Sequence, residues 1–204
     1  MSDAMQLTAL YDRSAPADLT ISMVEIRDRG MIDVRGLTKD RKFMAAAKAT
    51  LGTALPKKPR TSIVSGKFTC LWLSVDQWLI MCPLKDKDAL LAKLNTAFDG
   101  VHAMVTDMSD ARTVLRLKGA EVSHVLMKGG SIDFTQKMFT AGSVRRMTFA
   151  DIPAMVHIVQ GEPDTYDLLM FRSQAHHVWD WLALTARAGS NIGLPGNLET
   201  PQTV

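Results

Sequence analysis

The sequence predicts an α+β fold of two related lobes, and the first observation behind this prediction is a complete structural unit in residues 105–134. Apolar and polar side chains alternate at 113–118, as in a half-buried strand. Gly119 breaks the strand, and an apolar helical face follows at 120–128. Two glycines then stop the helix, because Gly tolerates the left-handed backbone found at helix ends.

The second observation is that this order occurs twice. The strand IDVRG at 32–36 precedes a helical pattern at 37–51, so that VRGL parallels LKGA at 117–120. The third observation is that strand-like runs and an amphipathic helix close each half, at 89–98 and 175–187. We interpret this order as a degenerate duplication, in which each lobe has two strands, a helix, further strands and a closing helix.

The first lobe is expected over residues 19–100, after a loose and polar N-terminal arm at 1–18. Alternation at 19–27 predicts a strand. The turn signal DRG follows it, which predicts that this strand pairs with the next one, 31–35, as a hairpin.

Two helices of the first lobe have candidate caps. Thr38 is expected to cap the helix that ends at residue 51, and Asp86 the helix at 87–98. Between these helices three strands are predicted, at 61–64, 68–73 and 77–82.

The second lobe is expected over residues 101–188 and opens with a strand at 101–108. Ser173 is expected to cap its closing helix. The tail at 189–204 has three Gly, two Pro and no periodicity, so we expect it to be extended. Further strands are predicted at 144–149, 154–160 and 165–171.

Composition favours a soluble, cytoplasmic protein with a proper core. The 204 residues carry a net charge of +3 with both signs interspersed, which is a weak argument for nucleic acid. No apolar run approaches the ~20 residues that span a bilayer, so we expect no membrane partner. Cys70 and Cys82 lie in apolar runs and are expected to be buried free thiols.

The sequence has no phosphate-binding loop, nucleophile elbow or metal-ligand spacing, so no motif argues for a catalytic, cofactor-binding or metal-binding residue, and we expect none in this chain. His176 and His177 are adjacent, and successive helical side chains point about 100° apart, which favours a solvated or capping pair over a metal site. Asp107 and Asp110 could act as an acid–base pair, but turn and cap roles are favoured.

Four residues are predicted to lie at an interface with another protein. Arg145 and Arg146 form a basic pair that could face a phosphate or an acidic surface, as could the basic run at 57–60; a solvated face is the alternative. Trp181 and Leu184 fall off the apolar stripe of the last helix. An off-stripe Trp is typical of a binding hot spot, and simple partial burial is the alternative.

Five segments, in this order, carry a resemblance to a known family: IRDRGMIDVRG (26–36), LWLSVDQWLIMCP (71–83), VTDMSDARTVLRLKGAEVSHVLMKGGSIDF (105–134), Phe139-x-x-Gly142 with Arg145, and YDLLMFRSQAHHVWDWL (166–182). On these segments the chain resembles the gamma subunit of heterotetrameric sarcosine oxidase across nearly its whole length. The wider resemblance is to the aminomethyltransferase (glycine-cleavage T-protein) and YgfZ-like fold, which implies an α+β fold of two related lobes.

The resemblance implies a complex of four different subunits. The alpha subunit is expected to hold NAD and a domain for tetrahydrofolate, the beta subunit FAD and a shared covalent FMN, and the delta subunit zinc. The gamma subunit is expected to be a T-protein-like lobe pair with no cofactor of its own. No catalytic residue of the family maps onto this sequence.

We therefore expect a non-catalytic subunit of a flavoenzyme that oxidatively demethylates sarcosine, with the alpha, beta and delta subunits as partners. One alternative is the corresponding subunit of a related enzyme such as N-methylglutamate dehydrogenase. Another is a free-standing folate-binding protein of the T-protein or YgfZ kind. A nucleic-acid binder has only the net charge in its favour.

Overall fold

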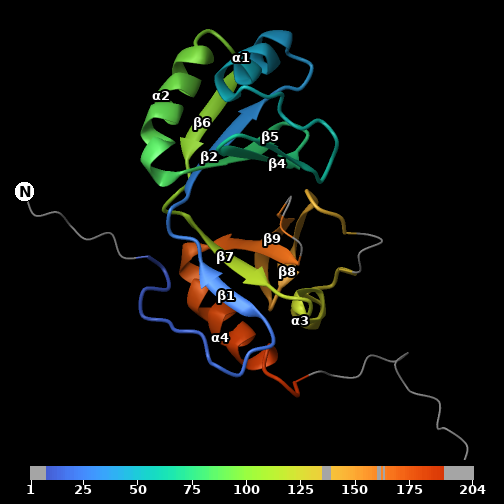
Figure 1. Ribbon diagram of the computed structural model, residues 1–204. Coiled ribbons are helices and arrows are strands. Elements are labelled where there is room, and N and C mark those ends of the chain that lie inside the picture. The colour runs from blue at the N-terminus through green and yellow to red at the C-terminus, as the bar shows by residue number, and fades with distance from the viewer. Residues whose placement is uncertain (1–7, 135–138, 160–161, 163, 191–204) are drawn as a thin grey trace, which may run out of the picture.

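The computed structural model of the chain describes residues 8–134, 139–159, 162 and 164–190. Two five-stranded antiparallel sheets pack face to face, and helices cover the outer face of each (Figure 1). The predicted α+β class is confirmed. Within these ranges, every helix is too short or too polar to serve as a membrane span.

Sheet one has the strand order β3-β4-β5-β2-β6. Its outer face is covered by α1 (Arg41–Leu51) and α2 (Lys87–Ala97), the latter preceded by the 3₁₀ turn η1 (Leu84–Asp86). The strands are β2 (Gly30–Gly36), β3 (Ser62–Ser65), β4 (Phe68–Ser74), β5 (Gln77–Cys82) and β6 (Ala103–Asp107).

Sheet two has the order β1-β7-β10-β9-β8. Its outer face is covered by α3 (Val122–Gly129) and α4 (Ala175–Thr185), the latter preceded by the 3₁₀ turn η2 (Arg172–Gln174). The strands are β1 (Ser22–Glu25), β7 (Arg112–Lys118), β8 (Val144–Phe149), β9 (Ile152–Ile158) and β10 (Thr165–Phe171).

The two sheets exchange one strand each. β1 pairs with β7 in sheet two, whereas β6, which precedes β7 in the chain, pairs with β2 in sheet one. The predicted hairpin between residues 19–27 and 31–35 is therefore wrong. The DRG segment instead lies where the chain crosses between the sheets, and there the Asp28 carboxylate accepts a hydrogen bond from the Leu84 amide at 3.1 Å. The lobes expected at 19–100 and 101–188 thus share strands.

The start of α1 differs from the prediction. The Asp40 carboxylate accepts hydrogen bonds from the amides of Lys42 and Phe43 at 2.8 and 3.2 Å, so Asp40, not Thr38, is the cap. An aspartate at this position satisfies amides that have no partner inside the helix. The predicted stop is confirmed, because Gly52 ends the helix with a left-handed φ of 70°.

The other two predicted caps make no capping hydrogen bond. Asp86 precedes α2 as expected, but its carboxylate pairs with Lys67 at 2.8 Å instead of with helix amides. Ser173 lies inside η2, and Gln174 is the residue that precedes α4. A 3₁₀ turn leads into each helix and takes the place of a side-chain cap.

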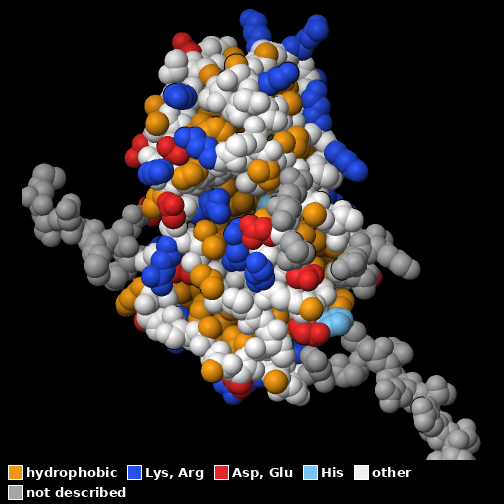
Figure 2. Space-filling model, in the orientation of Figure 1, with side chains coloured by type: hydrophobic (Ala, Val, Ile, Leu, Met, Phe, Trp, Pro, Cys, Tyr) orange, Lys and Arg blue, Asp and Glu red, His pale blue; other side chains and the backbone are white. Residues whose placement is uncertain are grey.

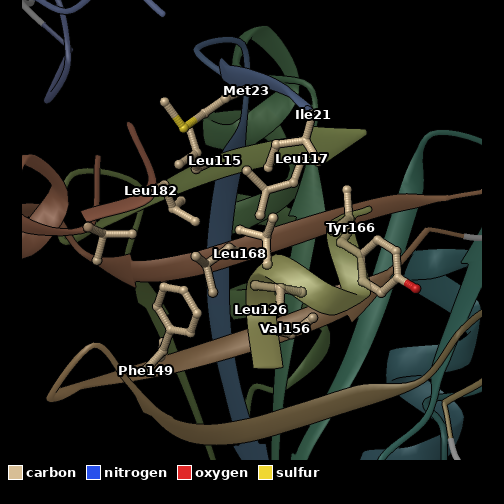
Figure 3. Packing of buried hydrophobic residues seen from close by; sticks show 14 of the residues in the cluster. Ile21, Met23, Leu115, Leu117, Leu126, Phe149, Val156, Tyr166, Leu168 and Leu182 are labelled. Atoms are coloured by element: carbon tan, nitrogen blue, oxygen red, sulfur yellow. The ribbon is translucent and has the colours of Figure 1, made fainter. Parts of the chain in front are cut away.

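Each helical layer shares an apolar core with its sheet. In sheet one, Phe43 of α1 packs against Trp78 of β5 and against Phe98, with ring centroids 5.7 and 5.0 Å apart. In sheet two, side chains from β7, β9, β10 and both helices converge in one cluster (Figure 3). Figure 3 labels Ile21, Met23, Leu115, Leu117, Leu126, Phe149, Val156, Tyr166, Leu168 and Leu182.

The layer between the sheets combines apolar residues with a buried ion pair. The Arg116 guanidinium donates to Asp167 through Nε and Nη2 at 2.7 and 2.9 Å, and Asp167 is only 2% exposed. The hydrogen bond to Asp167 raises the pKa of Arg116. The apolar members are Met31, Leu71, Leu73, Leu79, Met81, Val114, Val144, Met155 and Leu169.

Gly36 is expected to be essential to the α1 layer. A Cβ at this position would lie 2.5 Å from the Phe43 ring, so Gly36→Ala should lower the free energy of unfolding by about 1–3 kcal/mol through overpacking. Urea unfolding of the two proteins measures the difference. Leu37→Ala, at the exposed neighbouring residue, is the control and should change stability by about 0.5 kcal/mol or less. Equal effects of the two substitutions would contradict this packing account.

Candidate functional site

A cleft of about 640 Å³ opens where the edge of sheet one meets the edge of sheet two. Both sheets contribute to its walls, as does the segment that follows α3. Lys and Arg side chains also lie close together at the waist between the sheets on the face shown in Figure 2. The cleft is lined by Arg60, Trp72, Leu73, Ile132, Asp133, Phe139, Val144, Arg145 and Arg146.

Backbone hydrogen bonds hold the two sheet edges together at the cleft. The Val144 amide donates to the Arg60 carbonyl at 2.9 Å, and the Ser62 amide donates to the Gly142 carbonyl at 2.8 Å. Arg60 has a left-handed φ of 63°, which costs backbone energy for a residue other than Gly. The local backbone is therefore fixed by tertiary contacts, and the Arg60 side chain is presented at the cleft.

Arg145 is held in place from several sides. Its Nη1 donates to the carbonyls of Arg60 and Val144 at 3.2 and 2.9 Å, and its guanidinium lies 4.9 Å from the centre of the Phe139 ring. Burial, with the charge of Arg60, lowers the pKa of Arg145 below its ordinary value. The group stays charged at neutral pH because an arginine pKa lies far above 7.

His157 and Ser62 join the sheets behind the cleft. Ser62 Oγ lies 3.0 Å from His157 Nε2, and the imidazole is 2% exposed. Its Nδ1 has no hydrogen-bond partner among the described residues. Burial lowers the pKa of His157 to about 4, so the ring is neutral at pH 7.

This arrangement suits an anionic ligand or an acidic protein segment. Three arginines line the cleft with one carboxylate, Asp133. Planar guanidinium groups bind carboxylates and phosphates with paired hydrogen bonds, and Trp72 and Phe139 offer apolar surface beside them.

The four predicted interface residues fall in two places. Arg145 and Arg146 line the cleft. Trp181 is partly buried and packs edge-to-face on Phe149, with ring centroids 5.0 Å apart, so packing within the chain accounts for its position. Leu184 is 64% exposed on α4. Of the four residues, the arginine pair lines this cleft and the other two do not.

The residues for which capping or turn roles were favoured have hydrogen-bond partners within the chain. His176 Nε2 lies 2.8 Å from the Ala9 carbonyl and His177 Nε2 lies 2.7 Å from the Ala150 carbonyl, so the rings face different elements. Asp107 Oδ1 accepts hydrogen bonds from the Ser109 amide and hydroxyl at 2.9 and 2.6 Å, which is the predicted turn role. Although burial works against it, these bonds and the one from Lys87 lower the pKa of Asp107.

Both cysteines are buried free thiols, as predicted. Burial raises the pKa of Cys70 to about 12 and also raises that of Cys82. The thiolate form that reacts with electrophiles and metals is therefore disfavoured at both positions.

Comparisons with known proteins give a consistent result. The profile of the "Sarcosine oxidase, gamma subunit family" matches residues 35–188. A sarcosine oxidase subunit gamma from Corynebacterium sp. (strain P-1) is 30% identical over 166 residues, which cover 80% of this chain and 78% of that protein.

Two solved structures share the fold. A chain of the heterotetrameric sarcosine oxidase from Corynebacterium sp. U-96, in complex with pyrrole 2-carboxylate, matches with a TM-score of 0.78 at 22% identity and covers 91% of this chain and 93% of its own length. The glycine cleavage system aminomethyltransferase T from Bartonella henselae matches with a TM-score of 0.58 at 16% identity; the match covers 80% of this chain and 45% of that protein.

The neutral state of His157 predicts a pH dependence of stability. Its pKa of about 4 in the folded chain lies below the ordinary value near 6.5, so the unfolded chain takes up this proton first as the pH falls. This contribution is constant above about pH 6.5 and is lost between about pH 6.5 and 4. From pH 7 to 5 the wild type should lose about 1–2 kcal/mol more than His157→Gln, as measured by urea unfolding. Parallel pH profiles would contradict the assignment.

Proposed function

This chain belongs to the sarcosine oxidase gamma subunit family, and we propose that it acts as a non-catalytic structural subunit within such an enzyme. The complex would oxidise sarcosine with oxygen and water to glycine, formaldehyde and hydrogen peroxide, or pass the one-carbon unit to tetrahydrofolate as 5,10-methylenetetrahydrofolate. The observation that carries the proposal is the family match over residues 35–188.

The proposed partners are the alpha, beta and delta subunits of a cytoplasmic heterotetramer. FAD, FMN, NAD, tetrahydrofolate and zinc would be held by those subunits. The heterotetramer named for the Corynebacterium sp. U-96 structure, in which one chain shares this fold, supports this assignment.

We also propose that the two halves are related T-protein-type lobes. Strands of the two sheets correspond in order: β3-β4-β5-β2-β6 in sheet one matches β8-β9-β10-β7-β1 in sheet two. In each half a strand, a helix, three strands and a helix follow one another along the chain. The exchanged strands β1 and β6 occupy equivalent edges, which supports a duplicated unit in which each half donates its first strand to the other.

The arginine cleft is the proposed contact with an acidic segment of a neighbouring subunit. Arg145 is already fixed by two carbonyls and an aromatic ring, so binding would cost little side-chain entropy there. Arg146 is exposed and free to adjust to the partner. Leu184 is a second, separate candidate contact because of its exposure on α4.

Charge reversal at the cleft tests this contact. Arg145→Glu with Arg146→Glu should reduce recovery of the other subunits with the tagged chain at least tenfold, because like charges would face the acidic segment. Lys42→Glu with Lys93→Glu makes the same charge change on the exposed sides of α1 and α2 and should leave recovery unchanged. Equal recovery with both variants would remove the cleft from the interface.

Purification of the tagged wild-type chain from its own cells, with the proteins bound to it, identifies the parent enzyme. Three partner subunits, a flavin spectrum and sarcosine-dependent oxygen uptake are expected. Flavin and partners with turnover of N-methylglutamate instead would favour the related dehydrogenase. A colourless single chain would overturn the subunit proposal.

Folate binding is a second candidate function, favoured by the composition of the cleft. Trp72 and Phe139 offer aromatic surface for a pterin, and Arg60 and Arg146 offer charges for glutamate carboxylates. On this hypothesis calorimetry with tetrahydrofolate gives micromolar binding that Arg146→Ala weakens about tenfold. Absence of measurable heat with the wild type would contradict it.

A further inference from the structure

A second, smaller cavity of about 100 Å³ lies where the chain crosses between the sheets. One wall is the link from β1 to β2, which contributes Arg27 and Arg29. Another is the link from β6 to β7, which contributes Ser109, and Arg112 at the start of β7 completes that side. This cavity shares none of its lining residues with the arginine cleft.

The walls of this crossover cavity are fixed by backbone hydrogen bonds. The Ile26 amide donates to the Val114 carbonyl at 2.9 Å, and the Met108 amide donates to the Met31 carbonyl at 2.8 Å. Ser109 Oγ accepts from the Met31 amide at 2.9 Å. The cavity is therefore preformed by the strand exchange.

Four residues that line this cavity each have a buried polar atom without a hydrogen-bond partner among the described residues: Arg29 Nε, Arg112 Nε, Thr8 Oγ1 and Glu25 Oε2. An unsatisfied buried polar atom costs about 1–3 kcal/mol, and more when the group is charged. That four such residues surround one small space favours a hydrogen-bonding occupant there.

The charges around the cavity are not balanced. Four arginines and two carboxylates line it. Glu25 Oε2 lies 3.4 Å from Arg27 Nε, and Asp110 and Arg172 interact within the chain. Among the described residues, no carboxylate lies within ion-pair distance of Arg29 or Arg112.

Arg112 has an aromatic and a like-charged neighbour, and the favourable charge of Asp33 acts on it from beyond ion-pair distance. Its guanidinium lies 5.0 Å from the centre of the Phe171 ring. Burial and the like charge of Arg146 lower its pKa, against the opposing effect of Asp33. Asp33 itself accepts from Gln77 Nε2 at 2.5 Å.

We propose that the crossover cavity binds one small oxyanion, of the inorganic phosphate or short carboxylate class, between Arg29 and Arg112. Such an anion would accept hydrogen bonds from both guanidinium groups and neutralise their charge. Roughly three waters would also fit this volume, and they would supply hydrogen bonds but no charge. The charge imbalance therefore favours the anion. The site does not rest on the proposed function of the arginine cleft.

Calorimetric titration of the full chain with phosphate, at constant ionic strength, tests the site. One binding event is expected, and Arg29→Gln and Arg112→Gln should each weaken it at least tenfold. Lys93→Gln, at an exposed position of α2 outside both arginine-lined sites, is the control and should leave the affinity unchanged; Arg60→Gln reports any binding in the arginine cleft instead. Circular dichroism confirms folding, and if Arg112→Gln does not fold, Arg29→Gln decides alone.

The ligand class and the rival occupants have distinct outcomes. Acetate that competes with phosphate identifies a site for short carboxylates as well, whereas acetate without effect restricts it to the phosphate class. Loss of binding in Arg60→Gln alone would move the site to the cleft and overturn the proposal. Absence of phosphate and acetate binding to the wild type would also overturn it and leave the cavity to water.

Discussion

The exchange of β1 and β6 between the two sheets is the constraint on which the rest of this structure depends. β7 has β1 on one side and β10 on the other, and β2 lies between β5 and β6. Neither half of the chain can complete its sheet without a strand from the other half. The exchange also brings the crossover links together and sets the opposite sheet edges, β3 and β8, against each other at Thr61 and Ser143.

The sheets must therefore pack through a layer that serves two purposes. Its apolar residues stabilise the contact, whereas Asp33, His157 and Asp167 place titratable groups at 2–6% exposure in the same layer. Buried charges cost desolvation energy, and Asp167 is compensated by paired hydrogen bonds from Arg116. Such pairs fix register, because a one-residue slip of β10 would turn Asp167 toward the apolar helical face.

Local patterns predicted most elements because their cause is local. The strands at 77–82, 144–149 and 165–171 have the predicted bounds: β5 and β10 are short runs buried on both faces, whereas the middle of β8 alternates between half-buried and exposed side chains. The partner of a strand is not a local property. The DRG turn signal was consistent with a hairpin, but pairing of β1 with β7 depends on residues nearly a hundred positions away. A predicted helix cap can also be lost to a neighbouring side chain: the Asp86 carboxylate pairs with Lys67 and makes no capping hydrogen bond.

In the candidate sites, too, single residues could be predicted from the sequence, but their neighbours in space could not. The arginine pair at 145–146 could be selected from the sequence, but its neighbours Arg60 and Trp72 belong to the opposite sheet. Basic character in the run at 57–60 was the only available signal for Arg60. No pattern pointed to Arg29 and Arg112, which line one cavity because the chain crosses between the sheets twice.

The two arginine-lined sites differ in size, and this difference separates their roles. The larger cleft lies between sheet edges and holds a side chain, Arg146, that remains exposed. A partner segment can reach it without disturbing either sheet. The crossover cavity is several times smaller, and residues of both links line it. An occupant there would stabilise the strand exchange itself, since Arg29 follows the exchanged strand β1 and Arg112 begins the strand that receives it. A ligand that binds only the folded chain adds to its stability by mass action. Anion binding in the crossover cavity would thus stabilise both sheets, whereas the cleft would bind a neighbouring subunit after the chain has folded.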